Sequence, residues 1–261
     1  MTLIKHELRR GWVALGIWTG SIAAMLAVCI LLFPEMKGQT DAINQAFGSM
    51  GSFTAAFGMD VLNFGTLSGF YAIECGNVLG LGGAFFAALT AVGALSGEEK
   101  ERTAEFLLTH PVSRVRVITE KLMGVLIQVT VLSVTVFLIS MAFIPAAGEE
   151  IPWKELGLLH LGYYLLQLVI VGICFGISAF VRKGAAGLGL GVAMMLYFAN
   201  LIANITEDAE FLKYITPFGF ADGAQIVGDG KLDGLMVAVC MAIGLCGVAA
   251  AYWKYSGKDI Q

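Results

Sequence analysis

Residues 11–33 read GWVALGIWTGSIAAMLAVCILLF, and none of these side chains is charged. An α-helix rises about 1.5 Å per residue, so a run of this length crosses the hydrocarbon layer of a bilayer, which is about 30 Å thick. The run is also longer than the apolar part of a secretory signal peptide, and no small-residue cleavage site follows it. The stretch therefore predicts a first transmembrane helix that is retained in the chain.

Five further apolar stretches have a similar length, and they cover about residues 66–95, 122–144, 156–181, 184–205 and 234–253. A membrane span must satisfy its own backbone polar groups, and these runs are continuous rather than alternating, so we expect helices. Hydrophobic residues make up 57% of the chain, charged residues only 14%, and the mean hydropathy is +0.79. Ordinary soluble domains are far less apolar. The sequence predicts an all-α integral membrane protein, with residues 1–261 forming one bundle of six transmembrane helices.

Lysine and arginine are distributed unevenly between the two sides of this arrangement. Four of the 16 basic residues fall on one side, namely Lys37, Lys154, Lys213 and Lys231, and the others fall on the opposite side together with both chain ends. Loops rich in lysine and arginine stay in the cytoplasm. We therefore expect the N- and C-termini to be cytoplasmic.

The inner segment 96–121 reads SGEEKERTAEFLLTHPVSRVRVITEK. Ser96 and Glu99 have the spacing of a capping box, Pro111 stops a helix, and Ser113 can cap a second helix that leads into the third span. We expect a helix, a break and a helix, with a short cytoplasmic helix between the second and third spans. The alternative is a solvated connector whose charges only follow the positive-inside rule.

At this segment the sequence resembles the permease subunits of ATP-binding cassette (ABC) transporters, in the type-two exporter (ABC-2) class. The family pattern of E-x-x-x-G-T-x-E-x-L-L-x-x-P-V-S-R is matched by Thr103 to Leu108 and by Pro111 to Arg114, with Glu98 at its first position and Lys121 entering the next span. Arg102 departs from the pattern, because glycine is usual there, and the local helix is then expected to run further. The segments 5–10, 215–226 and 254–260 are similar to the family in a less specific way.

The resemblance implies that the segment docks into an ATPase subunit and couples ATP hydrolysis to transport. The residues expected to make this contact are Glu98, Glu99, Glu101, Arg102, Thr103, Glu105, Phe106, Leu107, Leu108, Pro111, Ser113 and Arg114. The implied partners are two ABC ATPase subunits, which hold the ATP and Mg, and a second permease copy or a homologous permease. The implied location is the bacterial cytoplasmic membrane, with export as the direction of transport.

Glu74 is the one acidic residue inside an expected span, and a charge at the bilayer centre is costly. It is a candidate for the substrate pathway, together with Asn77 one turn later, with which it could share a hydrated groove. A protonated or locally paired acid is the alternative. We expect His160, near the outer end of the fourth span, to lie at the membrane interface.

The sequence lacks the residue patterns that several other classes of function require. Gly257-Lys258 is followed by Asp259, so no phosphate-binding loop is formed, and we expect no cofactor, no metal site and no enzymatic activity in this chain. The net charge of −4, with no basic face, argues against nucleic acid as a partner. A stand-alone secondary transporter or channel remains the alternative function, and a scaffold or a membrane enzyme is a further one.

Glycines recur four residues apart at Gly172 and Gly176 and at Gly187 and Gly191. Such spacings let membrane helices approach closely. We expect these glycines to pack helices within the chain, and contact with a second copy is the alternative.

Overall fold

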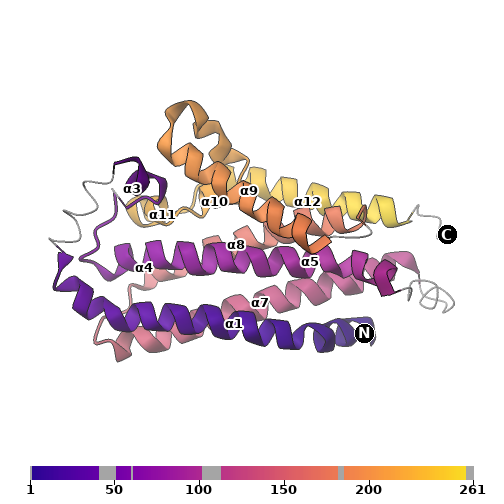
Figure 1. The fold of residues 1–261 in the computed structure, drawn as a ribbon, viewed down its shortest axis with the longest axis horizontal. Helices are drawn as coiled ribbons and strands as arrows, with labels where there is room; N and C mark the ends of the chain where they lie inside the picture. Colours follow the sequence, from indigo (N-terminus) through magenta and orange to yellow (C-terminus); the bar gives the residue numbers. More distant parts are fainter. Residues whose placement is uncertain (1, 41–50, 60, 102–112, 182–184, 257–261) are drawn as a thin grey trace.

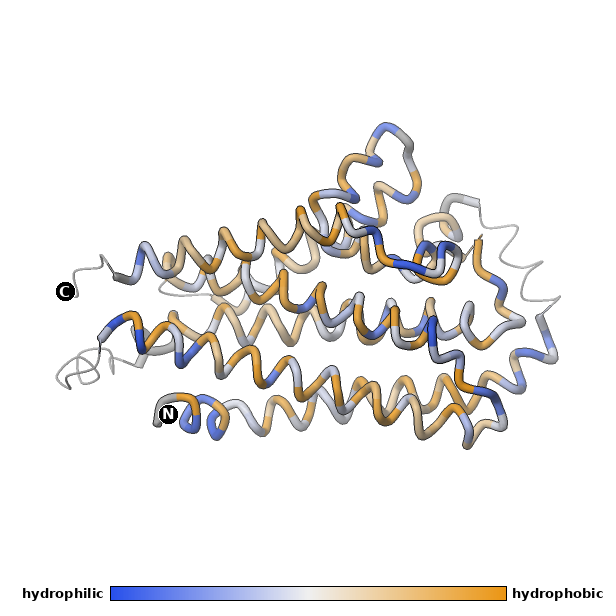
Figure 2. Tube along the Cα trace, turned by 180° about the vertical axis from the view of Figure 1, so that it is seen from behind, coloured by the Kyte–Doolittle hydropathy of each residue, from blue (hydrophilic) through white to orange (hydrophobic). Residues whose placement is uncertain are grey.

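The computed structural model describes residues 2–40, 51–59, 61–101, 113–181 and 185–256. Within these residues six helical segments are long and apolar enough to cross a membrane. The long helices run side by side, and the first and last described residues lie at the same end of the bundle (Figure 1). We call this the terminal end, and the other the distal end. Apolar residues cover the middle of the helices, whereas hydrophilic residues gather near the two ends (Figure 2).

The six segments confirm the expected spans with small shifts of their bounds. They are α1 (Thr2–Lys37), a composite of α4 (Leu67–Cys75), η1 (Gly76–Leu81) and α5 (Gly82–Glu101), α7 (Arg114–Ala146), α8 (Trp153–Ser178), α9 (Ala185–Ile205) and α12 (Gly234–Ser256). α1, α5 and α7 continue beyond the expected spans into flanking polar residues, whereas α9 keeps almost the expected bounds and α8 ends three residues before the expected position 181.

Four short elements of the described chain lie at the distal end. They are α3 (Ser52–Ala56), the 3₁₀-helix η2 (Glu207–Tyr214), α10 (Pro217–Phe220) and α11 (Gly223–Asp229). Thr216 accepts a hydrogen bond from the Phe218 amide, and Asp222 accepts from the amides of Ala224 and Gln225, so both act as N-caps. These caps fold the connection between α9 and α12 back onto the bundle.

α8 forms the centre of the bundle and packs against α5, α7 and α12. Gly172 and Gly176 explain the close approach to α12, because a Cβ atom on either would overlap the backbone of Gly244 or Gly247. The expectation of packing within the chain is therefore confirmed for this pair. Gly187 and Gly191 on α9 instead have open space around them in this chain.

The capping box expected at Ser96 is wrong. The helix does not begin there, because α5 continues through Ser96 to Glu101. The Ser96 hydroxyl donates to the Val92 carbonyl one turn earlier, and the Ser96 amide donates to the Ser178 hydroxyl on α8. A serine that bonds the carbonyl of residue i−4 is compatible with a helix interior.

The expected cap at Ser113 is confirmed. Its side chain accepts a hydrogen bond from the Arg116 amide at 3.4 Å, and α7 begins at the next residue. The helix break and the coupling residues from Arg102 to Pro111 lie outside the described residues.

Candidate functional site

The structure places the two predicted pathway residues in different surroundings. Glu74 lies in the last turn of α4 and faces α1, where its Oε2 accepts from the Cys29 thiol at 3.5 Å. Asn77 lies in η1 and faces α9, where its Oδ1 accepts a hydrogen bond from the Tyr197 hydroxyl at 3.3 Å. Asn77 lines a pocket that does not include Glu74, so this pocket is not the expected groove shared by the two residues, and their role in a pathway stays a prediction.

A π-helix interrupts the second span beside Asn77. η1 covers Gly76–Leu81, and Tyr163 of α8 packs against it so closely that a Cβ on Gly76 or Gly80 would lie about 3 Å from the ring or its hydroxyl. Only glycine fits at both positions without movement of the tyrosine. Single π-turns within α-helices often occur at functional sites, because the extra residue redirects the side chains of the turn.

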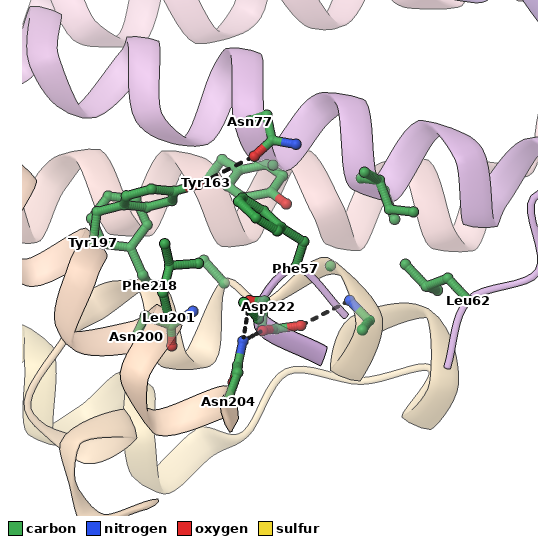
Figure 3. Close-up of a pocket in the computed structure, with 17 residues that line it drawn as sticks. Phe57, Leu62, Asn77, Tyr163, Tyr197, Asn200, Leu201, Asn204, Phe218 and Asp222 are labelled. Carbon is green, nitrogen blue, oxygen red and sulfur yellow. Dashed lines mark hydrogen bonds between the residues drawn. The ribbon is translucent and has the colours of Figure 1, made fainter. Parts of the chain in front are cut away.

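The pocket beside this turn lies at the distal end and has a volume of about 60 Å³. Its polar lining comes from three long helices and the connection after α9, namely Asn77, Tyr163, Tyr197, Asn200, Asn204 and Asp222. In Figure 3, Asn77 and Tyr163 lie on one side, and Asn200, Asn204 and Asp222 lie on the other. The sequence prediction included Asn77 alone among these residues.

Asn204 and Asp222 hold one side of the pocket in place. Asn204 Nδ2 donates to Asp222 Oδ2 at 2.9 Å and to the Ala56 carbonyl at 3.2 Å. Asp222 Oδ1 accepts from the amides of Ala224 and Gln225, which cap α11. One amide side chain therefore joins the end of α9 to α3 and to the connection before α12 (Figure 3).

Two buried polar atoms at the pocket have no hydrogen-bond partner within the part of the chain that the structure describes. They are the Tyr163 hydroxyl and Asn200 Oδ1, and both residues are buried. Most buried polar atoms in proteins are bonded, so two exceptions in one small cavity require an explanation.

A second polar network lies in the bundle close to the pocket, and the sequence analysis missed it. The Tyr71 hydroxyl donates to Ser140 Oγ and contacts His160 Nε2, both at 2.8 Å. His160 is only 7% exposed, so its side chain lies inside the bundle, and its expected depth at the membrane interface stays a prediction. The available signal was the spacing of His160, Tyr163, Tyr164 and Gln167, which places all four along one side of a helix.

The terminal end has its own buried polar contact. Lys121 of α7 is 1% exposed, and its Nζ bonds Glu7 Oε1 at 2.9 Å and the Ala94 carbonyl at 2.7 Å. A buried lysine requires such partners because the isolated charge is costly. Lys121 therefore joins α1, α5 and α7 near the two ends of the predicted coupling segment.

The predicted coupling residues fall around a gap in the described chain. Glu98, Glu99 and Glu101 lie in the last turns of α5, and Ser113 and Arg114 lie at the start of α7. Arg102, Thr103, Glu105, Phe106, Leu107, Leu108 and Pro111 lie outside the described residues. Among the residues that the structure describes, no group of three or more histidine, cysteine or acidic residues could hold a metal ion.

Comparison with known proteins agrees with this architecture. No curated protein matches the chain significantly. The sequence profile described as "ABC-2 family transporter protein" matches residues 34–225. That match covers well over half of the chain and includes the second to fifth spans, the predicted coupling segment and every polar residue of the pocket. The protein, a multi-pass membrane permease, therefore belongs to the ABC-2 family of transporter proteins.

Proposed function

We propose that this permease is the membrane subunit of an ATP-driven exporter in a bacterial cytoplasmic membrane. It pairs with a second copy or a homologous permease, and two separate ATPase subunits bind ATP and Mg and drive the cycle. Family membership supports ABC ATPase partners in general. Six membrane helices are few for a complete substrate pathway, which supports the pairing.

The coupling segment is the proposed docking site for the ATPase. It connects α5 to α7, so a force on it acts on two membrane helices at once. The contacts of Lys121 with Glu7 and Ala94 support this role, because they join α1, α5 and α7 close to the segment. Displacement of a rigidly joined group of helices transmits motion better than displacement of one helix. This buried contact is the observation that favours coupling over a passive connector.

The pocket at the distal end is the proposed part of the substrate pathway in this chain. Asn77 lines it, and the π-turn of η1 lies in its wall. Glu74 stays a candidate only through its position in the span, since the residue that it contacts is Cys29 on the side of α1.

The test is a double variant in the coupling segment, Glu99→Lys with Phe106→Ala. We expect it to insert normally, to lose association with its co-expressed ATPase and to transport poorly. Loss of a buried anchor commonly costs about 2 kcal/mol or more, which corresponds to about thirtyfold in affinity. Affinity purification followed by quantification of the bound ATPase measures this loss.

The matched control is the same pair of changes at the distal end, Glu150→Lys with Phe211→Ala, where Phe211 is exposed. This control should retain the ATPase at the wild-type level. If the coupling variant also retains its ATPase and transports normally, the segment is only a connector. Transport by the purified chain without ATP or an ATPase would instead favour a secondary transporter or a channel.

A further inference from the structure

The pocket offers more hydrogen-bond acceptors than the chain satisfies. Tyr163 Oη and Asn200 Oδ1 are buried in its wall, and no described residue bonds either atom. An unpaired buried polar atom carries a cost in free energy, because it has lost its hydrogen bonds to water. A ligand that donates hydrogen bonds would remove this cost, whereas a ligand with only acceptors could bond the tyrosine hydroxyl but leave the Asn200 oxygen unpaired.

The charge of the pocket favours a cation. Asp222 is the one residue with a formal charge among those that line it. Its hydrogen bonds come from Asn204 and from the amides of Ala224 and Gln225, and none comes from a basic side chain of the described chain. These neutral donors fix the position of the carboxylate but leave its charge without a counterion.

Aromatic rings complete the lining. Phe57, Tyr163, Tyr197 and Phe218 surround the polar groups, and Tyr197 meets Phe218 edge to face with ring centroids 5.3 Å apart. Aromatic faces attract cations, most strongly where water is excluded. A carboxylate next to aromatic walls is a combination that binds organic ammonium groups and repels anions.

We propose that this pocket binds the primary ammonium group of a small organic molecule. A primary ammonium carries three N–H donors, which suit the Tyr163 and Asn200 oxygens and the carboxylate of Asp222. A quaternary ammonium has no N–H donor, and an alcohol has no charge, so each would satisfy only part of the site. The cavity of about 60 Å³ holds a few water-sized groups, so the remainder of the molecule would extend out of it.

This inference rests on the proposed function only where the amine is considered a transport substrate. Binding itself is a property of the single chain and requires no ATPase. The alternative occupant is a cluster of ordered water molecules, which would bond the same two oxygens.

The experiment measures thermal unfolding of the purified chain in detergent at constant pH and ionic strength. The added compounds are 1-butylamine hydrochloride, 1-butanol, tetramethylammonium chloride and sodium butyrate. We expect a saturable rise of the Tm with butylamine alone. Equal stabilisation by butanol and butylamine, or no stabilisation by any of the four, would overturn the proposal in favour of water.

Two variants locate the effect. Asp222→Asn removes the charge but retains an N-cap residue, so the protein should fold and bind butylamine at least tenfold more weakly. Tyr163→Phe should weaken binding severalfold, because it removes one acceptor. The matched control is Asp229→Asn, an exposed acid at the other end of α11, which should bind like the wild type.

The outcomes separate this proposal from the proposed function. Wild-type binding that persists in Asp222→Asn would refute the site, whatever the ATPase does. Binding by the chain together with no ATPase association would refute the coupling and leave the site intact.

Discussion

The terminal and distal ends of the bundle use buried polar groups in opposite ways. At the terminal end, the buried Lys121 Nζ bonds Glu7 and the Ala94 carbonyl, and the Ser178 hydroxyl accepts from the amides of Leu95 and Ser96. At the distal end, Tyr163 and Asn200 each keep a buried oxygen without a partner beside a cavity. Satisfied buried groups fix helices relative to one another, and unsatisfied ones leave capacity for a ligand. This difference fits the two proposed roles, coupling to the ATPase at the terminal end and ligand binding at the distal end.

The largest expected effect comes from Lys121→Met at the terminal end. The change leaves Glu7 and the Ala94 carbonyl without their buried partner, and breaking such a pair commonly costs about 3–5 kcal/mol. We expect a Tm several degrees lower in detergent. Arg116→Ala is the control, since it removes an ion pair whose arginine is 60% exposed and should cost less than about 1 kcal/mol. Equal losses in the two variants would show that the buried contact does not stabilise this end.

The next effect concerns α8, which connects the two ends. Gly172→Ala puts a methyl group into the backbone of Gly244, and overpacking of this kind typically costs about 1–3 kcal/mol. Gly187→Ala on α9 is the matched control, because nothing in the chain lies within 4 Å of the new methyl group. Thermal unfolding should separate the two variants. If Gly172→Ala unfolds at the same temperature as the wild type, the close contact between α8 and α12 is wrong.

The smallest effect is expected from Asn204→Ala at the distal end. It removes hydrogen bonds to Asp222 and to the Ala56 carbonyl, at a cost of about 1 kcal/mol, because Asp222 retains two backbone donors. The control is Asn63→Ala. Asn63 is exposed, and its side chain accepts a hydrogen bond from the Gly65 amide within the same turn. A loss as large as that of Lys121→Met would mean that the distal end is as tightly joined as the terminal end.

The sequence was sufficient for the spans, because an apolar run of membrane length is a local signal. It did not distinguish α8 from α9, although their most apolar windows are 67% and 17% buried. Both helices are apolar on all sides, so the apolar sequence pattern does not show which of them other helices cover. For the same reason, the sequence predicted how far along the span His160 lies but not which neighbouring helices its side chain faces.

The pocket was largely beyond prediction. The sequence analysis included Asn77 only because it lies one turn after Glu74, an acid inside a span. The π-turn that carries Asn77 depends on the packing of Tyr163 against Gly76 and Gly80. Asp222 was known as part of a weak family pattern, and its place beside Asn204 comes from the folding of the connection after α9. Contacts between residues distant in the sequence define this site, and such contacts produce no periodic pattern in the sequence.

The central claim is that the two ends face opposite sides of the membrane, with the terminal end toward the ATPase. Single cysteines at Ser113 and Asp229, both exposed, test it most directly in a background without Cys29, Cys75, Cys174, Cys240 and Cys246. In intact cells a membrane-impermeant thiol reagent should label the cysteine at position 229 and should reach position 113 only after the membrane is opened. Labelling of position 113 in intact cells would contradict the account, because a cytoplasmic ATPase could not then reach the coupling segment.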